Sequence, residues 1–536
     1  MNPFRPLRRM GGLTPLSAAA IACVWGACLW GVTARAETTL RIVPHADLRN
    51  TDPVWTTAYI TRNHGYMIYD TLFAMDENMA SQPQMVDTWE QSADGLVYTF
   101  TLRDGLKWHD GKPVRAADCV ASLRRWGARD AMGQKLMQFT RSLEVVNERT
   151  FRLTLKEPYG LVVPSLSKIS SNVPFMMPER VAKTDPFTQI KENIGSGPFI
   201  FVDEEWVPGN KVVYIRNPDY VPREEPPSFA AGGKRVKVDR VEWLYIPDAA
   251  TAQAALAAGE VDYYERPPVD LLPLMERDPR LVVAMIDPLG VQGWLRPNHL
   301  HPPFDHPKAR RALLWMVNQE DYMRAIIGDP RYWRTCPAYF VCGTDFETDV
   351  GSEALMSQDL DRARQLLAEA GYRGEPVVLM DPTDIPMLHG ATLVTAQMLR
   401  KIGVDVQVQA MDWSTLTSRR AEKKAPAEGG WNLFHTWWTA ADVNSPVANI
   451  GVAGNCENAW FGWPCSEALE SLRDRLARST DPKEQFNLTV ELQRQAFKEV
   501  PYVNFGQWIL PTAYRKILDG VIVSPVPFFW NISKQE

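Results

Sequence analysis

The stretch that decides the fold is LRDGLKWHDGKPV at residues 102–114, followed after two residues by Ala-Asp at 117–118. Residues 96–102 alternate apolar and polar side chains, which predicts a half-buried strand. The sequence DGKP at residues 110–113 is typical of a turn, and residues 116–126 have helical character. We therefore expect the chain to leave a strand here, turn tightly and enter a helix.

Outward from this stretch, strand and helix patterns alternate irregularly and show no fixed-period repeat. Residues 40–44 are expected to form a strand. Helices are expected after His306, over residues 359–370, and from Asp481, where a capping residue precedes a proline. The pattern predicts an α/β fold of open sheets flanked by helices. A chain of 536 residues exceeds what one core usually organises, so two or more lobes are expected.

Residues 1–36 have the features of a secretory signal peptide, with expected cleavage after Ala36. A start with three arginines precedes an apolar run over residues 18–30, and Ala34 and Ala36 occupy the positions that a signal peptidase recognises. That run is short for a membrane helix, and no later segment reaches the roughly 20 apolar residues that a span needs. We expect a periplasmic protein; lipoprotein anchoring at Cys28 is the alternative.

The composition is that of a folded, acidic protein. Residues 1–36 hold four of the 58 basic residues and none of the 64 acidic ones, so the mature chain has a formal net charge of −10. That balance argues against nucleic acid and anionic membrane surfaces as partners. The chain also has 19 tryptophans, and because indole rings often line ligand clefts, their number favours solute binding.

Five cysteines remain after the signal segment, in two close pairs and one single residue. Disulfides Cys336–Cys342 and Cys456–Cys465 are the economical pairing in an oxidising compartment, with Cys119 left as a buried free thiol. A zinc site is the alternative, but neither pair has the two-to-four-residue spacing of a zinc knuckle.

The stretch at residues 102–118 resembles the family 5 extracellular solute-binding proteins, which include the oligopeptide-, dipeptide- and nickel-binding components of ABC importers. Cys119 departs from this pattern, since the family more often has valine there, and the change concerns packing. Further segments that resemble the family follow in order: GSGPF at 195–199, NPDY at 217–220, ALAAGEVD at 255–262, PF at 303–304 with ARRAL at 309–313, and ARQLLAEAGY at 363–372. The resemblance covers essentially the whole mature chain.

The resemblance implies a two-lobed periplasmic-binding-protein (Venus-flytrap) fold with an extra subdomain in the first lobe. The expected first lobe is residues 37–288 plus 509–536, with the subdomain near 76–190, and the second lobe is residues 289–508. The chain would cross twice between the lobes, near 287–290 and 508–512. Two such hinges let the lobes rotate while both cores stay intact, and ligand contacts made only in the closed state shift the open–closed equilibrium.

The resemblance also implies a function. The protein would be the substrate-binding component of an ABC importer, a monomer without a cofactor that captures a peptide or peptide-like solute and delivers it to the permease subunits. A metal-chelate-binding protein, a secreted hydrolase and a sensory receptor are the alternatives. A hydrolase needs a nucleophile and a base, and the sequence has no known nucleophile, phosphate or dinucleotide motif. His109-Asp110 could form a catalytic pair, but in this family stretch it is expected to organise the turn.

The ligand wall is expected in WNLFHTWWTAAD at residues 431–442. In peptide-binding relatives, a strand that ends in Trp-Thr leads to an aspartate that pairs with the ligand ammonium. Trp438, Thr439 and Asp442 match that pattern, although the loop is one residue longer and leaves the register open. A neighbouring indole would exclude water and strengthen the charge pair. Trp437 should lie on the opposite face of the strand, so at most one of the two indoles is expected to contact the ligand directly.

A partner for a ligand carboxylate is harder to place. Dipeptide-binding relatives have an arginine in the region that matches residues 381–389, and this chain has none there, which argues against strict dipeptide specificity. Arg296 could supply the cation, with a structural surface pair as the alternative.

Three of the eight histidines, His299, His301 and His306, lie close together in the sequence. A His-x-His pair could bind nickel or zinc. Because the family has a variable loop at this point, incidental metal affinity is the expected outcome, and no specific metal site is predicted.

Overall fold

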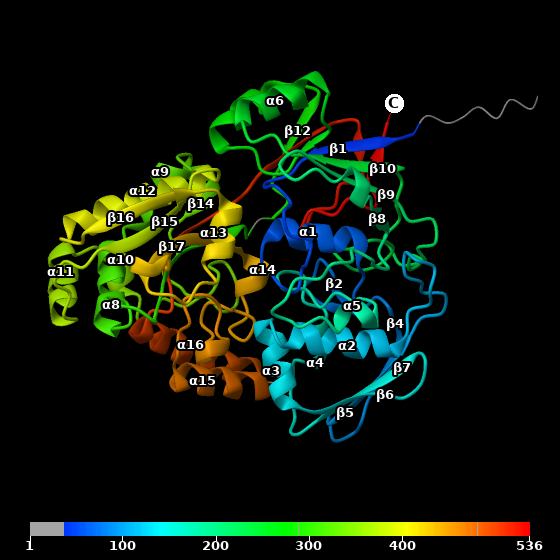
Figure 1. Cartoon of the computed structure of the whole chain (residues 1–536), viewed down its shortest axis with the longest axis horizontal. Coiled ribbons are helices and arrows are strands. Elements are labelled where there is room, and N and C mark those ends of the chain that lie inside the picture. Colours follow the sequence, from blue (N-terminus) through cyan, green and yellow to red (C-terminus); the bar gives the residue numbers. More distant parts are fainter. Residues whose placement is uncertain (1–36, 288, 480, 536) are drawn as a thin grey trace, which may run out of the picture. The chain divides into compact units, whose positions relative to one another are not determined.

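The computed structural model describes residues 37–287, 289–479 and 481–535, so the expected signal segment, with Cys28 and the cleavage site, lies outside the described residues. From Thr38 onward the chain forms two lobes, each built on its own sheet (Figure 1). Among the described residues, no helix has the length and apolar character needed to cross a membrane.

The first lobe is built on a seven-stranded mixed sheet. In spatial order the strands are β12 (Leu281–Ala284), β19 (Thr512–Arg515), β11 (Tyr263–Tyr264), β1 (Thr39–Val43), β10 (Arg240–Leu244), β9 (Lys211–Arg216) and β8 (Phe199–Phe201). β1 pairs in parallel with both of its neighbours because the chain returns to it through long connections. The helices α1 (Tyr59–Ile68), α6 (Ala249–Ala258) and α7 (Leu272–Arg277) belong to this lobe.

The second lobe is built on a six-stranded sheet. Its order is β14 (Trp333–Arg334), β18 (Val503–Trp508), β13 (Val291–Pro297), β17 (Leu433–Thr439), β15 (Val377–Pro382) and β16 (Val406–Met411). β13, β17 and β18 are buried along their whole length, which explains their runs of aromatic and aliphatic residues. The helices are α8 (Pro307–Met316), α9 (Gln319–Ile326), α10 (Glu353–Met356), α11 (Leu360–Glu369), α12 (Pro386–Lys401), α13 (Trp413–Arg419), α14 (Ala440–Val443), α15 (Glu467–Arg478) and α16 (Pro482–Glu499).

A four-stranded antiparallel sheet lies beside the first lobe, in the order β4 (Val86–Gln91), β5 (Val97–Leu102), β7 (Thr150–Leu155) and β6 (Thr140–Val145). The helices α2 (Ala116–Gly127), α3 (Ala131–Phe139), α4 (Val162–Leu166) and α5 (Glu179–Ala182) accompany it, and two short hairpins, β2 (Phe73–Met75) with β3 (Ser81–Pro83) and β20 (Leu518–Asp519) with β21 (Ser533–Lys534), complete the strands. Its apolar cluster also contains Leu476 and Leu488 from the second lobe, so the two parts share buried surface.

The chain passes between the two large sheets twice, from β12 to β13 and from β18 back to β19. The helices expected from local signals are confirmed, because their caps are present: His306 accepts the amide hydrogen of Lys308, and Asp359 accepts that of Arg362. The expected strands at 40–44 and 96–102 correspond to β1 and β5.

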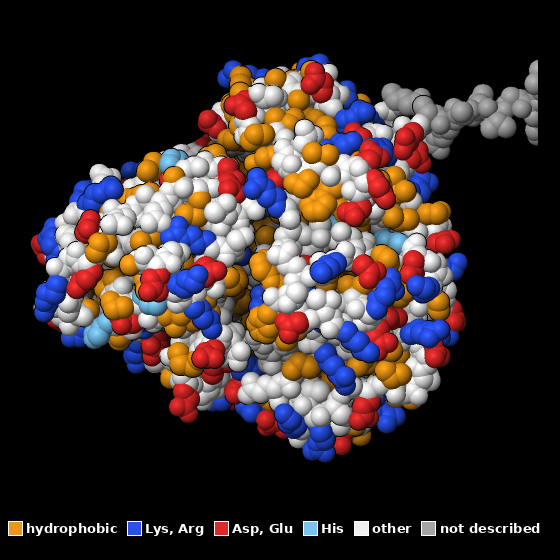
Figure 2. Space-filling view, viewed as in Figure 1, with side chains coloured by type: hydrophobic (Ala, Val, Ile, Leu, Met, Phe, Trp, Pro, Cys, Tyr) orange, Lys and Arg blue, Asp and Glu red, His pale blue; other side chains and the backbone are white. Residues whose placement is uncertain are grey.

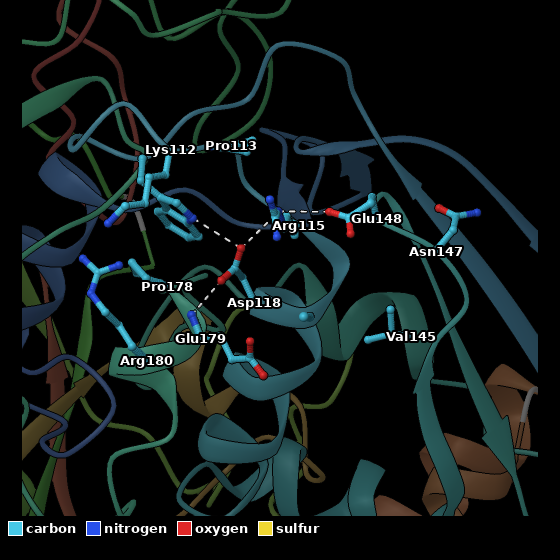
Figure 3. Close-up of a pocket in the computed structure, with 12 residues that line it drawn as sticks. Lys112, Pro113, Arg115, Asp118, Val145, Asn147, Glu148, Pro178, Glu179 and Arg180 are labelled. Atoms are coloured by element: carbon cyan, nitrogen blue, oxygen red, sulfur yellow. Dashed lines mark hydrogen bonds and ion pairs between the residues drawn. The ribbon is translucent and has the colours of Figure 1, made fainter.

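Asp118 explains why the stretch at 102–118 is so informative. Its carboxylate accepts hydrogen bonds from the indole of Trp108 (3.3 Å) and from the amides of Arg115 (2.8 Å) and Glu179 (2.6 Å), as Figure 3 shows. One buried side chain therefore joins the turn, the start of α2 and the start of α5. The shallow cavity of about 340 Å³ beside it is lined by residues of this one region.

His109 and Asp110 serve the same turn. The backbone amide of Gly195 donates to the His109 ring (3.3 Å), whose other nitrogen contacts the Gly197 carbonyl, and Asp110 accepts from Lys112 and Arg180. Burial lowers the pKa of His109 to about 4. The pair thus holds the turn against the GSGPF segment, as the sequence led us to expect.

Candidate functional site

Cavities lie between the two lobes, where Figure 2 shows the surface hollowed and bordered by apolar side chains. The largest has a volume of about 440 Å³, within the usual range of small-molecule sites. Tyr245 and Arg266 of the first lobe line it, together with Asp384 and Trp437 of the second. Both lobes therefore contribute walls to this cavity.

Two further cavities continue the cleft. One of about 260 Å³ lies between Trp55 of the first lobe and the aromatic loop at residues 456–465 of the second. A small one of about 20 Å³ shares Thr57 with that cavity and Trp437 with the largest one. The three cavities are therefore neighbours along one interlobe cleft.

Asp442 lies at the lobe interface, in α14 directly after β17, and is 1% exposed. Its Oδ2 accepts hydrogen bonds from Tyr59 (2.8 Å) and Ser170 (2.8 Å) of the first lobe and from Thr439 (2.9 Å). Its Oδ1 is buried and has no partner among the described residues. Burial raises the pKa of this carboxyl, opposed by the positive charges of Lys168 and Arg62. The carboxylate is thus anchored through one oxygen while the other is left without a donor.

The predicted aromatic wall is present, although Asp442 itself lines none of the three cavities. Trp438 packs edge-on against Tyr59 (6.3 Å) and Trp460 (5.3 Å), and Thr439 donates its amide to the Tyr59 hydroxyl (2.7 Å). Both Trp437 and Trp438 line the small cavity, and Trp437 also lines the largest one. Trp437 is therefore the more accessible of the two from the cleft. Although neighbouring residues of a strand point to opposite faces, both indoles line a cleft cavity.

Arg296 lies inside the second lobe and lines none of these cavities. It is 0% exposed, and its guanidinium donates to the carbonyls of Phe461, Gly451, Pro501 and Trp460 at 2.7–3.1 Å. Because backbone oxygens occupy its donors, Arg296 does not face a ligand in this structure. Arg296 therefore has a structural role, as the alternative supposed, but it joins backbone segments inside the lobe and does not form a surface ion pair.

Two arginines that the sequence did not single out face the cleft. Arg266 lines the largest cavity and has a buried Nη1 without a partner among the described residues. Arg420, directly after α13, lines the small cavity and has a buried Nε without a partner. Neither lies in a recognisable motif. What marks both is a buried guanidinium nitrogen without a hydrogen-bond partner among the described residues. Arg266 still has Glu265 as a counter-ion (3.7 Å), whereas Arg420 has no carboxylate partner among the described residues.

The three close histidines have separate contacts. His299 is half-buried, His301 contacts the Lys423 carbonyl through Nε2 (3.0 Å), and His306 caps α8. Among the residues that the structure describes, no group of three or more His, Cys, Asp or Glu side chains is placed to hold a metal ion.

Both expected cysteine pairs are bonded in the structure, Cys336 with Cys342 and Cys456 with Cys465, and Cys119 is a buried free thiol. The second disulfide closes a loop whose Trp460, Phe461 and Trp463 side chains line the 260 Å³ cavity. It therefore limits how far this aromatic wall can open.

Asp287, at the first passage between the sheets, gives a pH prediction. Burial raises its pKa to about 6, whereas the unfolded chain has the ordinary value near 4. The folded state thus holds this proton more tightly, and stability should fall as pH rises from about 4 to about 6 and stay lower above that. We expect Asp287→Asn to raise the free energy of unfolding at pH 7.5 by about 2 kcal/mol and to change it little at pH 4. Urea unfolding at both pH values measures this, and an equal gain at both would contradict it.

Comparison with known proteins agrees with this geometry. Residues 80–459 match the family model for bacterial extracellular solute-binding proteins, family 5 Middle. Over 486 residues the chain is 43% identical to a probable peptide ABC transporter periplasmic-binding protein, y4tO, of Sinorhizobium fredii, covering 90% of this chain and 91% of the relative.

Solved structures share the fold. The periplasmic binding protein DppA of Helicobacter pylori, in complex with the peptide STSA, has a TM-score of 0.77 at 22% identity, covering 93% of this chain and 99% of that one. The binding protein AgaA of A. tumefaciens R10, in complex with agropinic acid, has a TM-score of 0.76 at 20% identity with the same coverage. With its two lobes, its interlobe cleft and the match over most of its length, the chain belongs to the family 5 bacterial extracellular solute-binding proteins.

Proposed function

We propose that this protein is the periplasmic receptor of an ABC importer and that it binds a small peptide or peptide-like solute through an ammonium group. The observation that carries the proposal is the buried Asp442 Oδ1, which has no donor in the described part of the chain, beside an Oδ2 that has three. An ammonium supplies a charge-assisted hydrogen bond to such an oxygen and offsets the cost of the buried charge. No covalent step is needed, since the solute is captured and released unchanged.

Closure of the lobes would create this site. Tyr59 and Ser170 come from the first lobe and Asp442 from the second, so their hydrogen bonds exist only while the lobes are together. A solute that contacts Asp442 and the first lobe would favour the closed form over the open one. The permease can then distinguish loaded from empty receptor by shape.

We also propose the lobe limits expected from the sequence, 37–288 plus 509–536 and 289–508, with hinges near 287–290 and 508–512 and a subdomain near 76–190. The membership of the strands in the two large sheets supports these limits. We further propose that the protein is exported with cleavage after Ala36 and that the mature protein is a monomer.

Native mass spectrometry of protein purified gently from periplasm, compared with the same sample denatured, tests the function. We expect a discrete mass that departs on denaturation and belongs to an amine-bearing solute. A co-purifying solute without an amine would contradict the ammonium assignment. A catalytic turnover of that solute by the pure protein, abolished by changing one cleft residue, would contradict the binding-only function.

A further inference from the structure

Arg420 is a buried cation that forms no ion pair with any residue that the structure describes. The Arg420 side chain is 2% exposed. Among the described residues, its guanidinium donates one hydrogen bond, from Nη2 to the Thr57 hydroxyl (3.2 Å). Burial lowers its pKa to about 9, and no neighbouring charge contributes. An unpaired charge in such a position is costly, so its neutralising partner is expected from outside the chain.

Several other buried cations of the described chain have full sets of acceptors or a carboxylate partner, unlike Arg420. Arg296 donates to four carbonyls. The following cations pair with carboxylates: Arg125 with Asp52, Lys168 with Asp130, and Lys234 with Asp70.

Aromatic rings surround the Arg420 guanidinium. Its carbon lies 4.9 Å from the ring centre of Phe461, 5.2 Å from that of Trp460 and 5.8 Å from that of Trp413. Such rings hold a planar cation in one orientation and exclude water, which strengthens a bond to an anion. Phe461 and Trp460 also line the 260 Å³ cavity and belong to the loop closed by the Cys456–Cys465 disulfide.

The adjoining cavity has the charge that an anionic solute needs. Arg129 and Lys423 line it, against the single carboxylate of Glu457. The buried Nε1 of Trp460 has no partner among the described residues and is a further donor on this wall. The wall of the 260 Å³ cavity therefore combines two cations, an N–H donor without a partner among the described residues and apolar side chains.

We propose that Arg420 binds a carboxylate of the solute and that the disulfide-closed loop 456–465 packs against an aromatic or apolar side chain next to that carboxylate. This inference rests on the proposed solute-binding function and specifies its substrate class. Tyr59 connects the two charged sites, because its hydroxyl bonds Asp442 and its side chain lines the same small cavity as Arg420. The solute is accordingly a short zwitterion that carries both an ammonium and a carboxylate.

Calorimetry with three probes tests the two ends separately: the dipeptide Ala-Phe, its C-terminal amide and its N-acetyl form. In the wild-type protein the amide should bind about 10- to 100-fold more weakly than Ala-Phe, since a charge-assisted hydrogen bond is lost. In Arg420→Gln the acid and the amide should bind equally, while Arg420→Lys should retain part of the preference. Arg475→Gln, which neutralises an exposed arginine of the same lobe that lines none of the three cavities, should keep the full preference.

N-acetylation probes the function proposal and should weaken binding equally in wild type and Arg420→Gln. An amide penalty that persists in Arg420→Gln, or is absent from the wild type, would overturn the Arg420 inference and leave the ammonium site standing. Failure of Ala-Phe to bind the wild type would also overturn it, and the solute found by native mass spectrometry would then decide the functional proposal alone. Circular dichroism and melting temperature establish that each variant is folded.

Discussion

Asp442→Asn should weaken binding of the co-purifying solute by at least about 30-fold, because the variant keeps the shape of the side chain and removes its charge. The amide oxygen of asparagine can still accept from Tyr59 and Ser170, so closure of the empty lobes should change little. The expected loss is that of the proposed attraction between the buried carboxylate and a ligand ammonium, which water cannot replace at a site 1% exposed.

Isothermal titration calorimetry measures this effect. Asp405→Asn is the matched control, since Asp405 is an exposed carboxylate of the same lobe, and it should bind like the wild type. Unchanged affinity in Asp442→Asn would remove Asp442 from the binding site. Equal losses in both variants would point to a general effect of net charge.

Arg125→Ala should reduce the free energy of unfolding by about 3–5 kcal/mol, because it leaves a buried carboxylate without its partner. The Arg125 guanidinium donates to both oxygens of Asp52 (3.0 and 2.7 Å), and both side chains are 1% exposed. It also donates to the carbonyls of Thr184 and Thr188. The pair fastens α2 to the segment after β1.

Urea unfolding monitored by circular dichroism measures this loss. Arg478→Ala is the control, because Arg478 and Glu157 form an ion pair whose side chains are 41% and 48% exposed. Solvent screens such pairs, so that variant should lose less than about 1 kcal/mol. The double variant Arg125→Met with Asp52→Asn should be more stable than the sum of the single losses predicts. A loss below about 1 kcal/mol in Arg125→Ala would show that Asp52 is satisfied without it.

Local features of the chain were predictable from the sequence. The caps of α8 and α11, the turn at residues 110–113 and the two disulfides each depend on residues at most nine positions apart, so short-range spacing contains the information. The family segments extend this to the fold, because each occupies a place where backbone and side chain are closely constrained, as the three hydrogen bonds to Asp118 illustrate.

The sequence by itself determined the α/β class, the two-lobed fold through the family resemblance, and the cysteine pairs. It also singled out residues 431–442 as a candidate ligand wall, and the structure places Asp442 of that segment at the lobe interface. Which arginine is free to meet a ligand was decided by tertiary structure alone. Arg296 and Arg420 look alike in sequence, yet carbonyls up to 205 residues away satisfy the first, and the second is buried among rings without an anion. The physical reason is that the cost of a buried charge depends on partners distant in the chain, such as Tyr59, which lies 383 positions from Asp442.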